Sequence, residues 1–156
     1  KNYMEHLYNV DISWSKDRKG IICSPELTKE AGSCIEVATP PEFPKGIAGI
    51  WSPEHLFTAS VSSCLMTTFL AIAENSKLDF SIFTCKSTGK LEKIDGKLMM
   101  SEIILEPHVT IHSESDRALA EKIIFKSEAA CLISNSIKSK ISLHPVIQVN
   151  VLMKVL

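Results

Sequence analysis

The most pronounced feature of the hydrophobic pattern is the stretch from His55 to Ala73, which contains no Asp, Glu, Lys or Arg. A helix over this stretch would have no polar face and would need to be covered all round. Its start is well marked, because Ser52 can cap the free amides and Pro53 suits the first helical position. The pattern therefore predicts a long buried helix that begins at Ser52–Pro53 and ends near Asn75–Ser76.

The same stretch is long enough to raise a membrane-spanning interpretation. Seven of its positions carry a hydroxyl or an imidazole, and these are His55, Thr58, Ser60, Ser62, Ser63, Thr67 and Thr68. Such a segment is too polar for a comfortable single span, and ordinary polar segments flank it. We therefore favour a buried helix of a water-soluble protein.

Short strands are predicted before this helix and a hairpin after it. The predicted early strands are 4–14, 19–24 and 33–38. A charged turn at Lys16–Lys19 joins the first two, and the proline-rich run at 40–46 cannot continue a strand. After the helix, 80–93 and 97–112 are expected to pair through Ile94-Asp95-Gly96, because Asp-Gly favours a tight hairpin turn.

The C-terminal third predicts a second helix and a closing strand. The helix is expected from about Ser115 to Cys131, with Leu119, Ile123 and Ala130 on its inward face. A short helix to Ser139 and a strand over Val146–Val151 follow. Strands that are segregated from helices and joined by hairpins predict an α+β fold on an antiparallel sheet, in a single domain over residues 1–156.

The composition narrows the classes of function. The chain has 156 residues, of which 45% are hydrophobic and 22% charged, as in ordinary globular domains. Lys and Arg total 17 against 18 Asp and Glu, and no basic stretch is interleaved with aromatic residues. This balance argues against nucleic acid and membrane partners. The start of the chain has no pattern of a secretory signal, and five cysteines without framework spacing favour a reducing compartment, so we expect a cytoplasmic protein.

Cys64 and Cys131 are the candidate reactive residues. Cys64 lies inside the uncharged helix and Cys131 at the end of the second helix, and neither belongs to a metal-binding CxxC spacing. Small residues precede both, in 61–63 (VSS) and 129–130 (AA), and leave room for a reactant to approach the sulfur. We interpret the pair as a reactive thiol and a resolving thiol.

Two blocks around these cysteines resemble the OsmC/Ohr family, which comprises osmotically inducible protein C and the organic hydroperoxide resistance proteins. Residues 51–64 (WSPEHLFTASVSSC) resemble the central-helix motif, in which a Pro-Glu pair opens the helix and the peroxidatic cysteine follows ten residues after the Glu. Residues 130–137 (ACLISNSI) resemble the block that holds the second cysteine, and 17–20 (DRKG) is a charged turn near the start. The resemblance spans nearly the whole chain.

The resemblance implies an intertwined homodimer whose sheets wrap the central helices. It also implies a peroxidase in which Cys64 attacks an organic hydroperoxide, Cys131 resolves the sulfenate, and a lipoyl-type dithiol reduces the disulfide. Arg18 would supply the cation that a buried thiolate needs, oriented by Glu54. An apolar surround would suit organic or fatty-acid hydroperoxides, from Trp51, Leu56, Phe57 and Met66. No metal or organic cofactor is required.

Helix geometry adds a constraint on Glu54. In one continuous helix, the ten residues between Glu54 and Cys64 correspond to about 15 Å along the axis, which no side chain spans. If Glu54 serves the thiol, it must come from the partner chain or the helix must break. The location of active sites at the dimer interface in this family favours the partner chain.

Structural explanations exist for each of these residues. A lone Cys is often a small core residue, and we assign Cys23, Cys34 and Cys85 to packing. Arg18 in a charged turn is ordinarily solvated, and Glu54 fits the positive end of a helix dipole. His108 and His112 share a face of a predicted strand, but without a third ligand we do not expect a metal site.

Two other classes of function remain open. A hot-dog-like acyl-thioesterase also wraps an antiparallel sheet around a long helix, and it would use Glu54 without needing Cys64 or Cys131. A protein that binds small apolar ligands at a dimer interface would need neither a perturbed thiol nor turnover.

Overall fold

The computed structural model describes residues 4–27 and 32–150. The chain divides into two compact units, Lys1–Leu56 and Phe57–Leu156, and each is described by itself below. The single domain over residues 1–156 stays a prediction.

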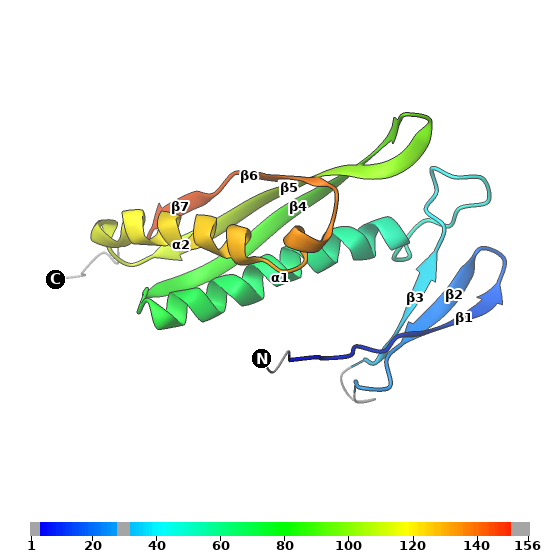
Figure 1. The fold of residues 1–156 in the computed structure, drawn as a ribbon, viewed down its shortest axis with the longest axis horizontal. Coiled ribbons are helices and arrows are strands. Elements are labelled where there is room, and N and C mark those ends of the chain that lie inside the picture. The colour runs from blue at the N-terminus through cyan, green and yellow to red at the C-terminus, as the bar shows by residue number, and fades with distance from the viewer. Residues whose placement is uncertain (1–3, 28–31, 151–156) are drawn as a thin grey trace. The chain divides into compact units, whose positions relative to one another are not determined.

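The first unit contains a three-stranded antiparallel sheet in the order β1-β2-β3 (Figure 1). Its strands are β1 (Asp11–Lys16), β2 (Lys19–Cys23) and β3 (Cys34–Ala38). The last two match the predicted ranges to within a residue. The prediction for the first strand was wrong at its start, because β1 begins at Asp11 and not at Met4. Asp11 is opposite Cys23, the last residue of β2, so a strand that began earlier would have no partner there.

The long helix α1 runs from Pro53 to Asn75, as the sequence predicted. The Ser52 hydroxyl accepts a hydrogen bond from the backbone amide of His55 (3.2 Å), which is the expected cap. Lys77, just beyond the helix, has a φ of 56°, a left-handed conformation that ends helices.

Burial of α1 differs from the expectation of a helix covered on all sides. In the single chain only one stripe is buried, formed by Val61, Cys64, Leu65, Phe69 and Ala73. Met66 is 39% exposed and Leu70 is 42% exposed. By length and composition α1 could also cross a membrane, but core helices of soluble proteins have the same length and apolar character. One sheet covers only one side of a helix, which explains the exposed stripe.

The second unit is built on a long hairpin. β4 (Phe80–Ile94) and β5 (Lys97–Ile111) pair antiparallel along their whole length. The connecting Asp95 and Gly96 have φ values of 48° and 80°, as a tight Asp-Gly hairpin turn requires. This part of the sequence prediction is confirmed.

The other edge of β5 carries strands that the antiparallel prediction did not anticipate. β6 (Lys140–Leu143), which was not predicted, and β7 (Val146–Val149) both pair parallel to β5, at successive parts of its length. The chain reaches them after a helix, and a helical crossover returns the next strand in a parallel direction. The sheet is therefore mixed.

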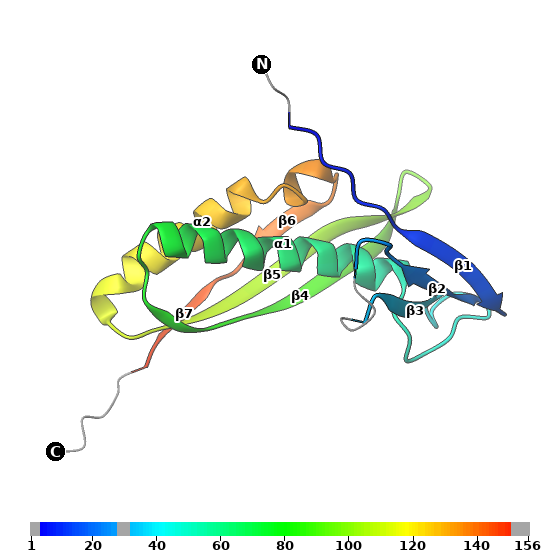
Figure 2. The same cartoon turned by 90° about the horizontal axis from the view of Figure 1, so that it is seen from below.

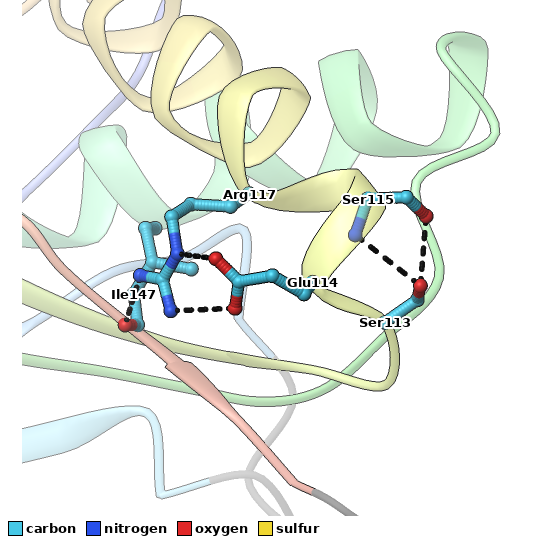
Figure 3. A network of polar contacts seen from close by, with 5 residues as sticks. All are labelled: Ser113, Glu114, Ser115, Arg117 and Ile147. Carbon is cyan, nitrogen blue, oxygen red and sulfur yellow. Dashed lines mark hydrogen bonds and ion pairs between the residues drawn. The ribbon is translucent and has the colours of Figure 1, made fainter.

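The crossover contains α2 (Arg117–Ala130), with the short 3-10 helices η2 (Glu114–Asp116) before it and η3 (Ser134–Ser136) after it. Arg117 holds the start of α2 against the sheet (Figure 3). Its guanidinium donates to both carboxylate oxygens of Glu114 (2.5 and 3.0 Å) and to the backbone oxygen of Ile147 in β7 (2.8 Å). The Ser113 hydroxyl caps η2 by accepting from the amide of Ser115 (3.3 Å).

Both helices share a core with the sheet (Figure 2). One cluster joins Phe69 and Ala73 of α1 to residues of β5 and α2, namely Val109, Ile111, Ala120, Ile123 and Ile124. Ile123 is buried as predicted, but Ala130 is exposed. The buried stripe of α2 passes through Ser127 and continues to Cys131, so Ala130 falls beside it.

A second cluster, which contains Val61, Leu65, Ile103 and Leu105, holds the first half of α1 against the hairpin. Here α1 approaches β4 closely at Gly89. A Cβ at Gly89 would collide with the Thr58 hydroxyl and the Met100 methyl group. This close approach of helix and strand explains the glycine.

Candidate active site

Packing of both helices on one sheet brings Cys64 and Cys131 together. Cys64 lies on the buried stripe of α1, and Cys131 is the residue at which the chain leaves α2, with an extended conformation (φ −66°, ψ 110°). Both thiols are free and buried. The two thiols lie close enough for a hydrogen bond between them to shift the pKa of each. The structure therefore joins the two cysteines that the sequence singled out.

The surroundings of Cys64 favour the thiolate. Burial by itself raises the pKa of this thiol, but hydrogen bonds outweigh burial and leave the pKa below its ordinary value. In decreasing order the donors are the Cys131 thiol, the backbone amide of Ile133, the Thr68 hydroxyl and the backbone amide of Leu132. Thr68 lies one helical turn after Cys64, with 4.0 Å between Sγ and Oγ1. A thiolate here is stabilised by fixed dipoles of its own chain.

Cys131 has the opposite character. Burial raises the pKa of this thiol, and the hydrogen bond with Cys64 and the charge on Cys64 raise it further. The side chain and backbone of Ser134 act in the opposite direction but do not offset these effects. The two pKa shifts therefore favour the thiolate at Cys64 and the protonated thiol at Cys131.

The turn after α2 aims the backbone amides at the sulfurs. Ile133 is in the α conformation, and the amide of Asn135 donates to the carbonyl of Cys131 (3.0 Å), so the chain reverses tightly. Sequence reasoning missed these donors, because every residue type except proline supplies a backbone N–H. The spacing of four residues between Cys64 and Thr68 was the signal that could have identified Thr68.

Arg18 and Glu54 belong to the first unit, where they line one cleft. The cleft has a volume of about 780 Å³, and both side chains line it. Most of its other walls are apolar, including Ile12, Trp14, Val37, Pro40, Phe43 and Pro53. Two cations, Arg18 and Lys19, and two anions, Asp17 and Glu54, line the cleft beside these apolar walls. Such a cleft can orient a substrate with a polar end and a hydrocarbon part.

The fold explains why these two residues share a cleft. Asp17, in the turn between β1 and β2, has a φ of 49°, and the carbonyl of the next residue, Arg18, accepts from the amide of Thr39 (3.1 Å). The amide of Ala38 donates to the carbonyl of Trp51 (2.8 Å), which holds the segment before α1 beside β3. The turn and the first residues of α1 are thus tied to the same end of β3.

The structure describes the surroundings of each apolar residue that was expected around a substrate. Trp51 is 50% exposed and contacts His55 edge to face. Leu56 is half-buried, Phe57 packs beside the cluster that contains Val61, and Met66 is exposed. None of the four belongs to the described lining of the cleft with Arg18 and Glu54.

The distance argument for Glu54 requires one continuous helix between Glu54 and Cys64, and α1 is continuous there. α1 is one helix from Pro53 to Asn75, so the ten residues from Glu54 to Cys64 rise about 15 Å along its axis. Within one chain the Glu54 carboxylate is therefore out of reach of the Cys64 sulfur along this helix.

The assignment of Cys23 and Cys34 to packing was wrong. The two residues form a disulfide, with 4.2 Å between their Cα atoms. They are directly opposite each other in the β2–β3 ladder, a long-range pairing that residue spacing alone does not reveal. Cys85 is free and half-buried beside the second core cluster, and burial raises the pKa of its thiol.

Within the described parts of the chain, no group of three His, Cys, Asp or Glu residues is placed to hold a metal ion. His112 lies just beyond β5, and its Nε2 is 3.7 Å from a carboxylate oxygen of Asp79. His108 lies on β5 opposite Thr84.

Comparison with known proteins agrees with this architecture. A family model described as OsmC-like protein matches residues 46–145, a range that includes Glu54, Cys64 and Cys131 but not Arg18. The uncharacterized protein YmaD of Bacillus subtilis is 25% identical over 143 residues, which cover 90% of this chain and 92% of YmaD.

Solved structures share the fold. The OsmC-like protein VCA0330 of Vibrio cholerae has a TM-score of 0.80 at 22% identity, over 91% of this chain and all of that one (100%). An organic hydroperoxide resistance protein from Elizabethkingia anophelis has a TM-score of 0.70 at 20% identity, over 94% of this chain and 100% of that one. At these identities the similarity establishes the α+β fold with its central helices.

Proposed function

The chain belongs to the OsmC-like protein family, and we propose that it is a cysteine-based peroxidase that reduces organic hydroperoxides to alcohols. The observation that carries the proposal is the asymmetric thiol pair. Cys64 and Cys131 are buried in contact, and their surroundings shift the pKa of Cys64 down and the pKa of Cys131 up. Perturbed thiols of this kind are typical of reactive sites and not of packing residues.

In the first step the Cys64 thiolate attacks the distal oxygen of the hydroperoxide. The O–O bond breaks, an alkoxide leaves and takes a proton to become the alcohol, and Cys64 becomes a sulfenic acid. The thiolate is the nucleophilic form, so the hydrogen bonds that lower the pKa of Cys64 raise the reactive fraction at neutral pH.

In the second step Cys131 attacks the Cys64 sulfenic acid. An S–S bond forms, the S–O bond breaks, and water leaves. The charge on Cys64 is one of the causes that raise the pKa of Cys131, and this charge disappears when the thiolate becomes a neutral sulfenic acid. Oxidation of Cys64 therefore lowers the pKa of Cys131 and activates it only when it is needed. The disulfide protects Cys64 from further oxidation.

We assign Arg18 and Glu54 to orientation and charge compensation of the reacting groups. Their common cleft supports a joint role, and the rise of α1 argues that Glu54 acts on the Cys64 of a second copy of the chain. The apolar walls of the cleft and the side chains of Trp51, Leu56, Phe57 and Met66 would then favour a hydroperoxide with a hydrocarbon part.

The proposal includes a homodimer and an external dithiol. A second copy would cover the exposed stripe of α1 at Met66 and Leu70. A dithiol of the lipoyl type would reduce the Cys64–Cys131 disulfide by two successive exchange steps and restore both thiols. Thiols stay reduced in the cytoplasm, and we expect the protein to act there.

The test is a steady-state assay with cumene hydroperoxide and dihydrolipoamide. Wild-type protein should consume both at equal rates, and Cys64→Ser should lose turnover and the first oxidation step. Cys85→Ser is the matched control, because Cys85 is a free cysteine outside the pair, and it should keep full activity. Single-turnover consumption of peroxide by Cys64→Ser would refute the proposal.

The same variants separate the alternatives. An acyl-thioesterase that uses Glu54 would hydrolyse an acyl-thioester in the Cys64→Ser and Cys131→Ser proteins as fast as in the wild type. A protein that only binds apolar ligands would show neither hydrolysis nor peroxide turnover.

A further inference from the structure

The Cys23–Cys34 disulfide lies at one end of the ladder that builds the cleft. Cys23 is the last residue of β2 and Cys34 the first of β3, and the register pairs them directly. The ladder continues through successive pairs to Lys19 opposite Ala38. Gly20, Val37 and both members of that last pair line the cleft that holds Arg18 and Glu54. The bridge and the cleft therefore share the same two strands.

This small sheet has little hydrophobic core of its own. In the described strands β1, β2 and β3 only Gly20, Val37 and Ala38 are buried, and every residue of β1 is exposed. A sheet of this size is marginally stable without support from packing or a covalent link. A cross-link between paired strands restricts their separation, so its state affects how well the ladder is held.

The bridge is also accessible to a reductant. Cys34 is exposed and Cys23 is half-buried, whereas Cys64 and Cys131 are both buried. The Ser33 hydroxyl lies 3.9 Å from Cys34 Sγ and must be the donor, because a disulfide sulfur has no proton. A hydroxyl in this position stabilises the thiolate that leaves when the bridge opens, and a stabilised leaving thiolate speeds exchange.

We propose that Cys23–Cys34 is a second redox site, which exchanges with a dithiol/disulfide couple and sets the rigidity of the cleft around Arg18 and Glu54. A dithiol attacks one sulfur of the bridge, the S–S bond breaks, and the other cysteine leaves as a thiolate that takes a proton. The second thiol of the reductant then displaces the first cysteine. The products are two cysteine thiols and the cyclic disulfide of the reductant, and the reverse reaction closes the bridge.

The test uses a full-length variant in which only this pair remains, Cys64→Ser with Cys85→Ser and Cys131→Ser. It is equilibrated in graded ratios of dihydrolipoamide to lipoamide, quenched in acid and alkylated, and the modified cysteines are counted by mass spectrometry. The pair should pass from bridged to doubly alkylated in one two-electron transition. No peroxide is present, so the result does not depend on the proposed peroxidase activity.

Hydrogen exchange in the same samples measures how firmly the strands that line the cleft are held together. On reduction, the amides of β2 and β3 should exchange at least about ten-fold faster, whereas those of α2 should not change. Cys23→Ser with Cys34→Ser should show the fast exchange at every ratio. If the protein with Cys23→Ser and Cys34→Ser fails to fold, exchange in β2 and β3 is compared between the reduced and the oxidised wild-type protein in the same buffers. A bridge that resists the most reducing ratio in the folded protein, or one that opens with unchanged exchange in β2 and β3, would overturn the proposal.

Discussion

Beyond the effect of burial, which raises both pKa values, the hydrogen bond between Cys64 and Cys131 shifts the pKa of Cys64 down and the pKa of Cys131 up. It stabilises the thiolate of Cys64 and holds the proton on Cys131. The pair therefore divides two chemical roles between identical side chains, and the division comes from position. Cys64 also accepts hydrogen bonds from backbone amides of the turn after α2, whereas Cys131 lies beside the negative charge of the Cys64 thiolate.

The contact predicts a specific pH dependence. The pKa of Cys64 is lowered, so its alkylation by iodoacetamide should rise with pH and level off at a lower pH than that of free cysteine. Cys131→Ala removes the strongest donor and should shift this profile to higher pH, with several-fold slower alkylation at neutral pH. Cys85→Ala should leave the profile unchanged. An unshifted profile in Cys131→Ala would show that the contact does not control the thiolate.

Oxidation by a hydroperoxide should join Cys64 to Cys131. One equivalent of cumene hydroperoxide should convert the wild type to a Cys64–Cys131 disulfide, which requires Cα atoms about 4.4–6.8 Å apart. In Cys131→Ser, Cys64 should accumulate as sulfenic and then sulfinic acid. Peptide mapping by mass spectrometry distinguishes these products, and a Cys64 bonded to Cys23, Cys34 or Cys85 would contradict the assignment.

The exposed stripe of α1 predicts an obligate homodimer. Leu70 is 42% exposed in the single chain. Leu70→Lys would place a charge in the predicted interface and should yield monomers in sedimentation at micromolar concentration. Phe125→Lys is the control, because Phe125 is an exposed apolar residue (52%) on α2, and it should leave the dimer intact. Unfolding of the wild type should depend on protein concentration. A stable wild-type monomer would rule the dimer out.

The position of Glu54 predicts complementation between subunits. Arg18→Ala should slow the reaction of Cys64 with peroxide, and Glu54→Ala should slow it less, without additivity, because the pair acts as one unit. Heterodimers of Glu54→Ala and Cys64→Ser subunits should regain one intact site if Glu54 acts across the interface. Activity is measured on heterodimers purified by two affinity tags. Absence of recovery would show that Glu54 acts within its own chain, through a broken helix, or does not act on Cys64 at all.

Among these substitutions, we expect the largest loss of stability from Phe69→Ala. The side chain of Phe69 is fully buried, and its ring centroid lies 5.2 Å from that of Phe80 and 4.7 Å from that of Phe83. Phe69→Ala should lower the free energy of unfolding by about 3–5 kcal/mol, because a cavity remains in the shared core. Phe125→Ala should change it by less than about 1 kcal/mol. Denaturant unfolding measures both.

Features with local causes could be predicted from the sequence. Ser52 and Pro53 marked the start of α1, and Asp95-Gly96 marked the hairpin turn, because a cap and a turn depend on neighbouring residues alone. The uncharged stretch of α1 likewise indicated a helix that one sheet cannot cover. The blocks around Cys64 and Cys131 indicated the family and the candidate thiols.

The tertiary structure decided the relationships between distant residues. It paired β6 and β7 parallel to β5, because α2 reverses the chain between them. It placed Cys23 opposite Cys34 through the register of β2 and β3, where the sequence showed only two unrelated cysteines. Above all, it aimed the amides of Leu132 and Ile133 at the Cys64 sulfur. A backbone amide carries no residue signature, and only the packing of two helices on one sheet determines which sulfur it meets.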